Sequence, residues 1–521
     1  MTAIRTQTWI LISIVVLLFF LVPGINHGLW SPDEPRVAGT CSEMARTRDF
    51  VVPHLNGKPF LEKPPLYYAA GAVAGSLLGE DKDVPYRLVS LLFSTLTIII
   101  TFLMASRKHG PIMGIIAGGI LGSSWEFFML SRWIQVDVAL VFGITLAMYA
   151  YQRWVDSSKV TDSLIFGFAT GIAFMAKGLV GPAIIATAVT TDIVRRKDLG
   201  IVWRIKPFLV VASMLIAVLP WIIALWNRGG WTFMREVLVV NNLMRFTGAP
   251  EGAALGHQQG ALYYLEQFPG NILPWTLIFI PAFVASIRKF RDDPYISWFI
   301  GPFILLSLAS TKRGVYLVPL YPAAACMMAN WLGKAHRMKW EDILVKITWA
   351  ASIAGCIAPF AGIYLGEPML GIGMGVFAVF SLVLITRGGV KQREAVSLVM
   401  TVCIAMCACT FVYFQYMKPN KDYLGFARQV LAVAGDRQII LLNPDESLKG
   451  VFPMVTGKTY EVVAYPSDIL REGLYLWSDW SGSTMNQLNK QYKVKVLIKK
   501  KLGREMAQLA FIVPDATKKK L

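Results

Sequence analysis

A short segment near the start of the chain combines acidic, basic and proline residues. Asp33 and Glu34 are adjacent in Trp30-Ser-Pro-Asp-Glu-Pro-Arg36, and Arg36 follows them. A carboxylate that is partly removed from water can be tuned toward general-base chemistry, and it can also hold a sugar hydroxyl or a metal ion. Paired acids in a turn also commonly cap the next helix. Residue types alone leave both interpretations open.

A second segment, Glu62-Lys-Pro-Pro65, is more specific. Two successive prolines fix φ at about −65° and remove backbone donors, so Glu62 and Lys63 are expected to be held in an extended conformation at the start of a helix. Rigidly placed charges are typical of catalytic sites. The alternative is a helix start with both side chains in solvent. Tyr67 fits an aromatic belt as well as a substrate contact.

Charged side chains interrupt apolar stretches again later in the chain. Lys177 lies between two apolar runs, where a lysine would cost about 2.5–3.5 kcal/mol, so it must reach the interface or pair with an anion. Lys312 and Arg313 break another apolar run just before Tyr316. Asp137 is expected either to form an internal ion pair or to help hold a sugar. Such cations could stabilise a negatively charged leaving group.

The elements that must position these groups are membrane helices. The chain has 521 residues, of which 55% are hydrophobic and 16% charged, and it repeats apolar runs of about 20 residues, the length that crosses a bilayer. We expect an α-helical polytopic membrane protein with about thirteen spans, the first a retained signal anchor. The expected spans are 8–26, 86–105, 111–130, 135–151, 163–177, 178–194, 207–226, 269–287, 295–310, 316–333, 343–365, 369–386 and 396–416.

Positive charge is concentrated in the short connections between these spans. The chain has 51 Lys and Arg against 33 Asp and Glu, and cations in short loops stay cytoplasmic during insertion. Topology therefore explains the basic character, and a nucleic-acid partner is not expected. The clusters that predict this side are Arg107-Lys108, Arg195-Arg196-Lys197, Arg288-Lys289, Lys334 with Arg337, and Arg387 with Lys391.

This topology places the N-terminus in the cytoplasm and three segments on the outer side: the loop 27–85, the loop 227–268, and everything after 417. Residues 1–417 are expected to form a transmembrane catalytic domain, with surface helices in the loop 27–85. Residues 418–521 change to mixed polar and apolar composition with strand-like runs, which predicts a small extracytoplasmic α/β domain. The six cysteines lack the spacing of a metal site or a disulfide frame.

The order of the motifs resembles that of the bacterial lipid A aminoarabinose transferases, over about residues 8–335. That family is related to the protein O-mannosyltransferases and shares their type C glycosyltransferase fold. The motifs that carry the resemblance are Asp33-Glu34, Val52-Pro-His-Leu-Asn-Gly-Lys58, Glu62-Lys-Pro-Pro-Leu-Tyr-Tyr68, Lys177-Gly178, His257 before Leu273-Pro-Trp275, and Lys312-Arg313 before Tyr316.

The resemblance implies an enzyme that moves a sugar from a polyprenyl phosphate carrier, such as undecaprenyl phosphate, to lipid A or another envelope acceptor. The reaction would take place at the outer face of the bacterial inner membrane. The implied catalytic residues are Asp33 and Glu62, and the implied ligands of a divalent metal (zinc, magnesium or manganese) are Glu62 and His257. The candidates for contacts with the donor phosphate or substrate are Glu34, Arg36, Lys63, Tyr67, Asp137, Lys177, Lys312, Arg313 and Tyr316.

The acceptor decides what Asp33 must do. An acceptor phosphate is already anionic, so Asp33 need only orient it, whereas a hydroxyl acceptor needs a general base. The alternatives kept open are a protein O-glycosyltransferase of the same fold, a transporter or lipid flippase, and a noncatalytic protein that binds the carrier lipid. A transporter would be expected to show repeated halves and ionisable groups near the bilayer midplane. The chain is expected to be a monomer.

Overall fold

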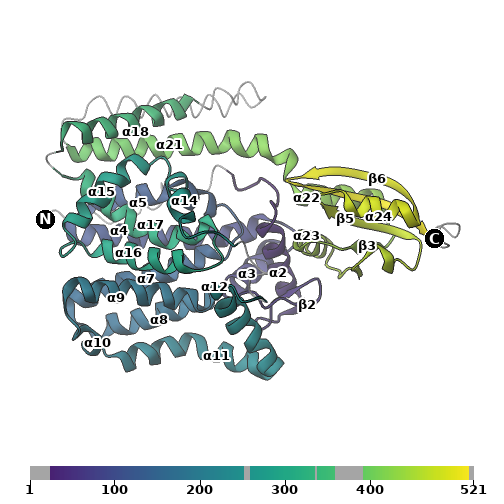
Figure 1. Ribbon diagram of the computed structural model, residues 1–521, viewed down its shortest axis with the longest axis horizontal. Coiled ribbons are helices and arrows are strands. Elements are labelled where there is room, and N and C mark those ends of the chain that lie inside the picture. Colours follow the sequence, from purple (N-terminus) through teal and green to yellow (C-terminus); the bar gives the residue numbers. More distant parts are fainter. Residues whose placement is uncertain (1–23, 251–257, 335–336, 358–390, 515–521) are drawn as a thin grey trace.

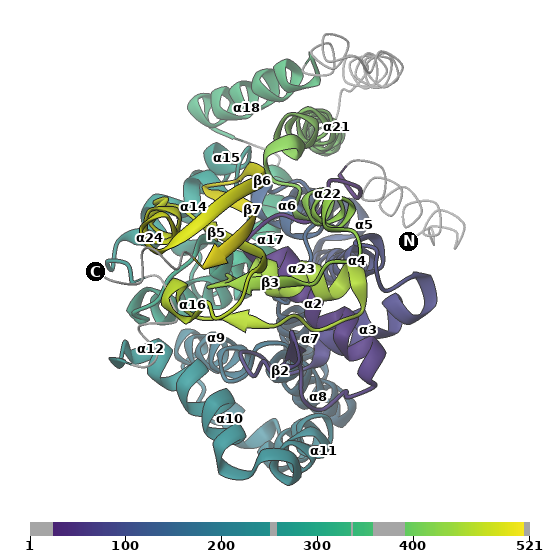
Figure 2. The same ribbon diagram turned by 90° about the vertical axis from the view of Figure 1, so that its right-hand side faces the viewer.

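The computed structural model describes residues 24–250, 258–334, 337–357 and 391–514. Long helices lie side by side in a bundle, and a small domain of strands and short helices extends from one end of it (Figure 1). Figure 2 looks along the bundle from that end, with the sheet of the small domain in front of the helices. The expected combination of a helical membrane protein with a C-terminal α/β region is confirmed.

Most of the expected spans that lie in the described residues correspond to helices. Within those residues, five helices are long and apolar enough to cross a membrane, or six if one bent pair counts as a single span. The predicted spans 8–26 and 369–386 lie wholly or mostly outside the described residues, so the total number stays a prediction. The main helices are α4 (Val84–His109), α7 (Asp137–Ser157), α8 (Val160–Lys177), α9 (Val180–Arg196), α11 (Pro207–Met234), α16 (Pro294–Leu308), α17 (Tyr321–Leu332), α18 (Lys339–Ile357) and α21 (Lys391–Met417).

Two expected spans are broken. The stretch 111–130 forms α5 (Pro111–Gly122) and the short helix α6 (Trp125–Leu130). The stretch 269–287 divides between α14 (Tyr263–Asn271) and α15 (Thr276–Arg288), which are bent by 119°. Pro274 lies at this second break, and a proline disfavours helical geometry at the residue before it. Apolar composition alone does not reveal such breaks.

The basic connections meet at one end of the bundle. At the far end of α4, Arg107 pairs with Asp156 at the end of α7 at 3.3 Å. Arg195, at the end of α9, donates to the carbonyl of Arg291 after α15. The small domain lies at the opposite end (Figure 1). The bundle therefore has one basic end and one end that is covered by loops.

The loop 27–85 forms part of that covered end. It contains α2 (Asp33–Thr47), a small hairpin of β1 (His54–Leu55) and β2 (Lys58–Pro59), and α3 (Leu66–Leu78). Two acids lie in the first turn of α2, where the helix dipole favours negative charge. Helix α3, in the segment expected to lie along the membrane surface, has 13 residues and packs against α2 and α4.

The C-terminal domain is built on a five-stranded sheet with the order β4-β3-β5-β7-β6. Strand β3 is parallel to β4 and β5, and β7 is antiparallel to β5 and β6. Its elements are α22 (Tyr423–Ala434), β3 (Ile439–Leu442), α23 (Glu446–Thr456), β4 (Val462–Val463), β5 (Gly473–Asp479), α24 (Ser483–Gln491), β6 (Tyr492–Leu502) and β7 (Glu505–Pro514). Helix α23 packs directly against α2, so this domain touches the helix that begins at Asp33.

Candidate active site

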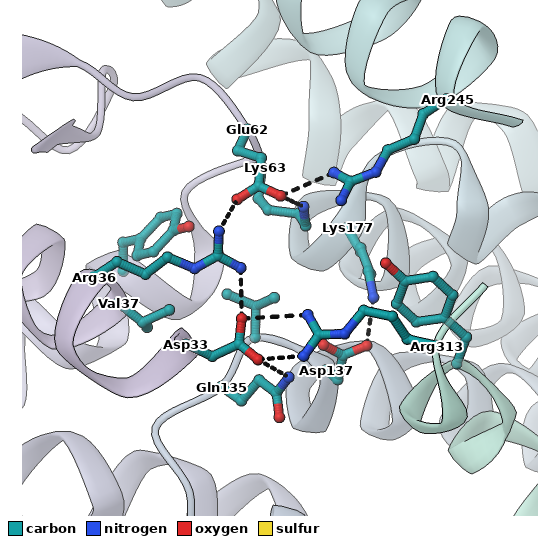
Figure 3. A pocket seen from close by; sticks show the side chains of 13 residues that line it. Asp33, Arg36, Val37, Glu62, Lys63, Gln135, Asp137, Lys177, Arg245 and Arg313 are labelled. Atoms are coloured by element: carbon teal, nitrogen blue, oxygen red, sulfur yellow. Dashed lines mark hydrogen bonds and ion pairs between the residues drawn. The ribbon is translucent and has the colours of Figure 1, made fainter. Parts of the chain in front are cut away.

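A polar cavity with about 360 Å³ of empty space, which includes space open to solvent, lies where the loop 27–85 meets the bundle. Its walls come from the start of α2, the segment before α3, the start of α7, the end of α8, and the loop after α16 (Figure 3). It also receives a side chain from α12 (Arg245–Thr247). The lining residues are Asp33, Arg36, Val37, Glu62, Lys63, Tyr68, Gln135, Val136, Asp137, Lys177, Arg245, Arg313 and Tyr316.

Asp33 is held by two arginines and an amide. Its carboxylate lies 2.5 Å from Arg313 Nη2 and 2.5 Å from Arg36 Nη2, and it accepts a hydrogen bond from Gln135 at 3.1 Å (Figure 3). Burial alone would raise the pKa of Asp33, but the Arg313 and Arg36 guanidinium groups more than offset it and lower the pKa to about 2. The carboxylate is therefore ionised at neutral pH.

Glu62 is surrounded by three cations. Its oxygens lie 2.7 Å from Lys63 Nζ, 2.9 Å from Arg245 Nη1 and 3.1 Å from Arg36 Nη1 (Figure 3). Burial opposes ionisation, but Lys63, Arg36 and Arg245 hold the pKa of Glu62 well below its ordinary value. Arg36 therefore bridges the two candidate catalytic carboxylates, Asp33 and Glu62.

Lys177 pairs with Asp137 instead of extending to solvent. The Lys177 Nζ lies 2.5 Å from the Asp137 carboxylate (Figure 3) and 4.0 Å from the centre of the Tyr316 ring. Helix α8 ends here because Gly178 adopts φ +69°, a conformation that L side chains rarely take. The Asn242 side chain accepts from the next amide, that of Leu179, at 2.9 Å. This turn fixes Lys177 at the cavity wall.

The charge of the lining is positive overall. Five lining side chains are basic and three are acidic, so the formal charge of the lining is +2. Fixed cations in a site that excludes water stabilise an anion more than the same cations would in water. The arrangement suits a phosphate group.

A second cavity of about 780 Å³ of empty space adjoins the first. The two cavities share Glu62, Lys63, Lys177, Arg245 and Tyr316. The rest of the second cavity is mainly apolar, with walls from α7, α9 and α16 that include Leu140, Val180, Ala183, Ile184, Leu305 and Leu306. A cationic end joined to an apolar wall fits a lipid with a charged head.

Three candidates from the sequence lie away from the cavity, and their expected substrate contacts need correction. Glu34 is buried against Arg87 of α4 at 2.9 Å. The Tyr67 hydroxyl lies 2.6 Å from Ser90 Oγ, inside the packing of α3 on α4. Lys312 Nζ donates to the carbonyls of Gln259 and Ala309 at 2.9 and 2.5 Å. Each side chain therefore joins neighbouring segments of the protein.

Glu34 belongs to a network that attaches the loop to the bundle. Besides Arg87, its carboxylate accepts from the backbone amides of Trp30 and Ile134 at 2.9 and 3.1 Å, and it lies 3.2 Å from His27. We expect Glu34→Gln to lower the free energy of unfolding by about 3–5 kcal/mol, because it leaves a buried arginine short of its partner. Thermal unfolding in detergent measures this loss. Unchanged stability with lost turnover per folded molecule would contradict the structural role.

Arg245, Gln135 and Tyr68 line the cavity but were not predicted as site residues. Arg245 follows a π-helical segment, η1 (Arg235–Met244), a rare geometry that is frequent at functional sites. The only sequence signals were the membership of Tyr68 in the Glu62 motif and the proximity of Gln135 to Asp137. Arg245 had no signal in the sequence.

The expected metal site does not fit Glu62 as it lies in this structure. Both of its oxygens face cationic side chains at 2.7–3.1 Å, which compete with a metal ion for the same lone pairs. His257, the other expected ligand, lies outside the described residues. Among the described residues there is no group of three or more His, Cys, Asp and Glu side chains that could hold a metal.

Comparisons with known proteins agree with this architecture. A family model described as dolichyl-phosphate-mannose-protein mannosyltransferase matches residues 62–224. An undecaprenyl phosphate-alpha-4-amino-4-deoxy-L-arabinose arabinosyl transferase of Edwardsiella ictaluri is 27% identical over 71% of this chain and 71% of its own length. The enzyme of the same name from Pseudomonas aeruginosa strain UCBPP-PA14 is 28% identical over 64% of this chain, and the alignment spans 61% of that relative.

The solved structures extend the likeness to almost the whole chain. ArnT from Cupriavidus metallidurans, in a crystal structure bound to undecaprenyl phosphate, superposes with a TM-score of 0.78 at 18% identity over 96% of this chain and 98% of that chain. The archaeal oligosaccharyltransferase AglB from Archaeoglobus fulgidus gives a TM-score of 0.50 at 12% identity over 99% of this chain and 77% of its own. This chain therefore has the type C membrane glycosyltransferase fold and is related in sequence to the bacterial aminoarabinose transferases, as its motifs predicted.

Proposed function

We propose that this protein transfers a sugar from a polyprenyl phosphate carrier to lipid A or another anionic acceptor of the bacterial envelope. The observation that carries the proposal is the pair of adjoining cavities, one cationic and one apolar, with shared side chains between them. The relatives named for the use of undecaprenyl phosphate-linked aminoarabinose support the same class of donor. The aminoarabinose sugar is the first donor to test.

The donor fits with its phosphate at the shared side chains and the start of its isoprenoid chain along the apolar wall. As the bond between the sugar and the phosphate oxygen breaks, negative charge grows on the departing polyprenyl phosphate. Lys63, Lys177 and Arg245 lie where the two cavities meet, so they can stabilise that charge as it develops. The acceptor oxygen then forms the new bond to the same sugar carbon.

Lys63 gives the donor site a pH dependence. Burial lowers the pKa of Lys63 to about 8, against the opposing effect of Glu62. Lys63 is therefore charged below that pH and loses its charge as the pH rises. We expect kcat/KM for the donor to fall above about pH 8, because this parameter reports groups of the free enzyme. A pH profile measures the fall, and the same fall in Lys63→Arg, which stays charged, would exclude Lys63 as its source.

The state of Asp33 favours an anionic acceptor. A general base works best when its pKa is near the working pH, whereas the two arginines hold the pKa of Asp33 at about 2. Such a carboxylate is a weak base for a sugar or protein hydroxyl. It can orient the acceptor through Arg36 and Arg313, and it can stabilise positive charge on the sugar as the bond to the carrier breaks. A phosphate acceptor needs no more than this.

Mass spectrometry of lipid A and other envelope glycans from cells with and without the gene tests the proposal. The expected result is an envelope lipid or glycan that carries an added sugar only when the gene is present. Identical lipid and glycan profiles in both strains, together with a sugar-modified protein that depends on the gene, would replace the proposal with a protein O-glycosyltransferase.

We further propose that the protein lies in the inner membrane with its N-terminus in the cytoplasm and the C-terminal domain outside, and that it acts as a monomer. This orientation is supported by the basic connections at one end of the bundle and the loops that cover the other end. Single cysteines at Leu470 in the C-terminal domain and Leu199 at the basic end, both strongly exposed, provide a matched pair. An impermeant thiol reagent should label Leu470→Cys in intact cells and Leu199→Cys only after lysis. The reverse pattern would invert the topology.

A further inference from the structure

The backbone of α23 in the C-terminal domain lies directly against the backbone of α2, the helix that begins at the candidate catalytic residue Asp33. A Cβ atom added to Gly450 of α23 would lie 2.2 Å from the carbonyl oxygen of Pro35. One added to Gly39 of α2 would lie 2.5 Å from the Gly450 Cα. These glycines allow α23 to approach the first turns of α2 more closely than side chains would permit. The contact lies beside Asp33 and Arg36.

Hydrogen bonds fix the domain on both sides of this contact. Ser447 Oγ lies 3.0 Å from Ser31 Oγ, just before α2. In the β1–β2 hairpin of the loop 27–85, the Asn56 side chain donates to the carbonyl of Tyr460 at 2.9 Å and accepts from the amide of Tyr460 at 2.8 Å. The first turn of α23 therefore has a defined position relative to the cavity.

Glu446, the first residue of α23, extends from this turn to Arg36. Its Oε2 lies 2.6 Å from Arg36 Nη1, and the same nitrogen lies 3.1 Å from Glu62 Oε2. The other terminal nitrogen, Nη2, lies 2.5 Å from Asp33. Arg36 thus bonds three carboxylates, and the one from the C-terminal domain is closer to Nη1 than Glu62 is. Glu446 does not line the cavity.

We propose that Glu446 is a positioning residue of the catalytic centre, through which the C-terminal domain fixes the Arg36 guanidinium between Asp33 and Glu62. The inference rests on the proposed transferase activity. A guanidinium is planar and has its donors in a fixed fork, so holding one nitrogen determines the direction of the other. Without Glu446, Nη1 is free to move onto Glu62, and Nη2 turns away from Asp33.

The expected effect is on turnover and not on donor binding. Lys63, Lys177 and Arg245, which meet the donor phosphate in the proposed function, have no ion pair with Glu446 among the described residues. We therefore expect Glu446→Gln to lower kcat by about ten-fold, with KM for the donor changed by less than about two-fold. Glu446→Asp, which keeps the charge on a shorter side chain, should recover part of the loss.

Glu461→Gln is the matched control. Glu461 lies in the same domain, pairs with an arginine, Arg471, and has a side chain 45% exposed compared with 47% for Glu446. Its partner Arg471 belongs to the same domain and is far from the cavity residues in the sequence. The assay uses the purified full-length protein with undecaprenyl phosphate-linked aminoarabinose and lipid A. We expect the control to keep the wild-type kcat, and equal kcat in the two variants would overturn the proposal.

A second background tests whether Glu446 acts through Arg36. In Arg36→Lys a single ammonium replaces the fork that bridges three carboxylates, so adding Glu446→Gln should cost less than about two-fold further. If Glu446→Gln lowered kcat by the full ten-fold in the Arg36→Lys background, Glu446 would act through another group. That result would also overturn the proposal. Absence of transfer by the wild-type protein itself would instead contradict the proposed function.

Discussion

Replacing Asp33 with Asn is expected to lower kcat by about 10³-fold, or about 4 kcal/mol in the activation barrier. The carboxylate holds Arg36 and Arg313 at 2.5 Å each, and Gln135 at 3.1 Å. An amide has no charge to hold two guanidinium groups, so Arg313 loses its carboxylate partner, and Arg36 keeps Glu62 and Glu446 at Nη1 but loses its partner at Nη2. The substitution also removes a negative charge that can face positive charge on the reacting sugar. Steady-state kinetics with purified protein measure the loss.

Asp192→Asn is the control for the cost of breaking such a cluster. Asp192 is buried at the opposite, basic end of the bundle, where it pairs with Arg195 and Arg196 at 2.6 and 2.7 Å. Both variants are expected to lose stability, but only Asp33→Asn should lose turnover per folded molecule. Near wild-type kcat in folded Asp33→Asn would remove Asp33 from the catalytic centre.

Glu62→Gln has the second largest expected effect, a loss of about 10²–10³-fold in kcat. Glu62 is the shared partner of Lys63, Arg36 and Arg245. Without its charge these three cations repel one another, and Arg245 loses the ion pair that joins α12 to the loop 27–85. The cations that meet the leaving phosphate would then be misplaced. Because the cavity keeps its positive charge, we expect donor binding to be weakened less than turnover. Separate measurements of kcat and KM distinguish the two effects.

Glu394→Gln serves as the comparison for Glu62. Glu394 also pairs with an arginine, Arg337, at 3.0 Å, but in α21 near the basic connection after α17. It should leave kcat unchanged. If Glu62→Gln transferred sugar at the normal rate, the assignment of the catalytic centre would be wrong.

The sequence predicted which charged residues belong to the site better than it predicted which way their side chains point. Asp33 and Glu34 are adjacent, but successive residues of an α-helix point about 100° apart, whereas residues three apart lie on one face. The helix begins at Asp33, so Arg36 joins Asp33 at the cavity while Glu34 turns toward Arg87. The unknown helix start, and not residue chemistry, caused the wrong prediction for Glu34.

Contacts between distant segments set the limit of prediction. Arg245 meets Glu62 across 183 positions and Arg313 meets Asp33 across 280. Arg313 was predicted because a cation broke an apolar run, and Arg245 was missed because it lies in a polar segment where an arginine is ordinary. The bent α14 and α15 pair was missed for a similar reason, since apolar composition continues through the break.

The position of the charges also bears on the transporter alternative. Transporters place ionisable residues near the bilayer midplane. Here the charged lining residues come from the loop 27–85 and from the helix ends that adjoin it, such as Asp137 at the start of α7 and Lys177 at the end of α8. A cavity at one end of the bundle suits chemistry at one membrane surface.

Transfer of a sugar by the purified protein tests the proposed activity most directly. The full-length protein is reconstituted with undecaprenyl phosphate-linked aminoarabinose and lipid A, and mass spectrometry follows both lipids. We predict that lipid A gains the sugar while undecaprenyl phosphate is released in equal amount, and that Asp33→Asn slows both changes by about 10³-fold. Unmodified lipid A and intact donor after incubation with the folded wild-type protein would contradict the proposed transferase activity.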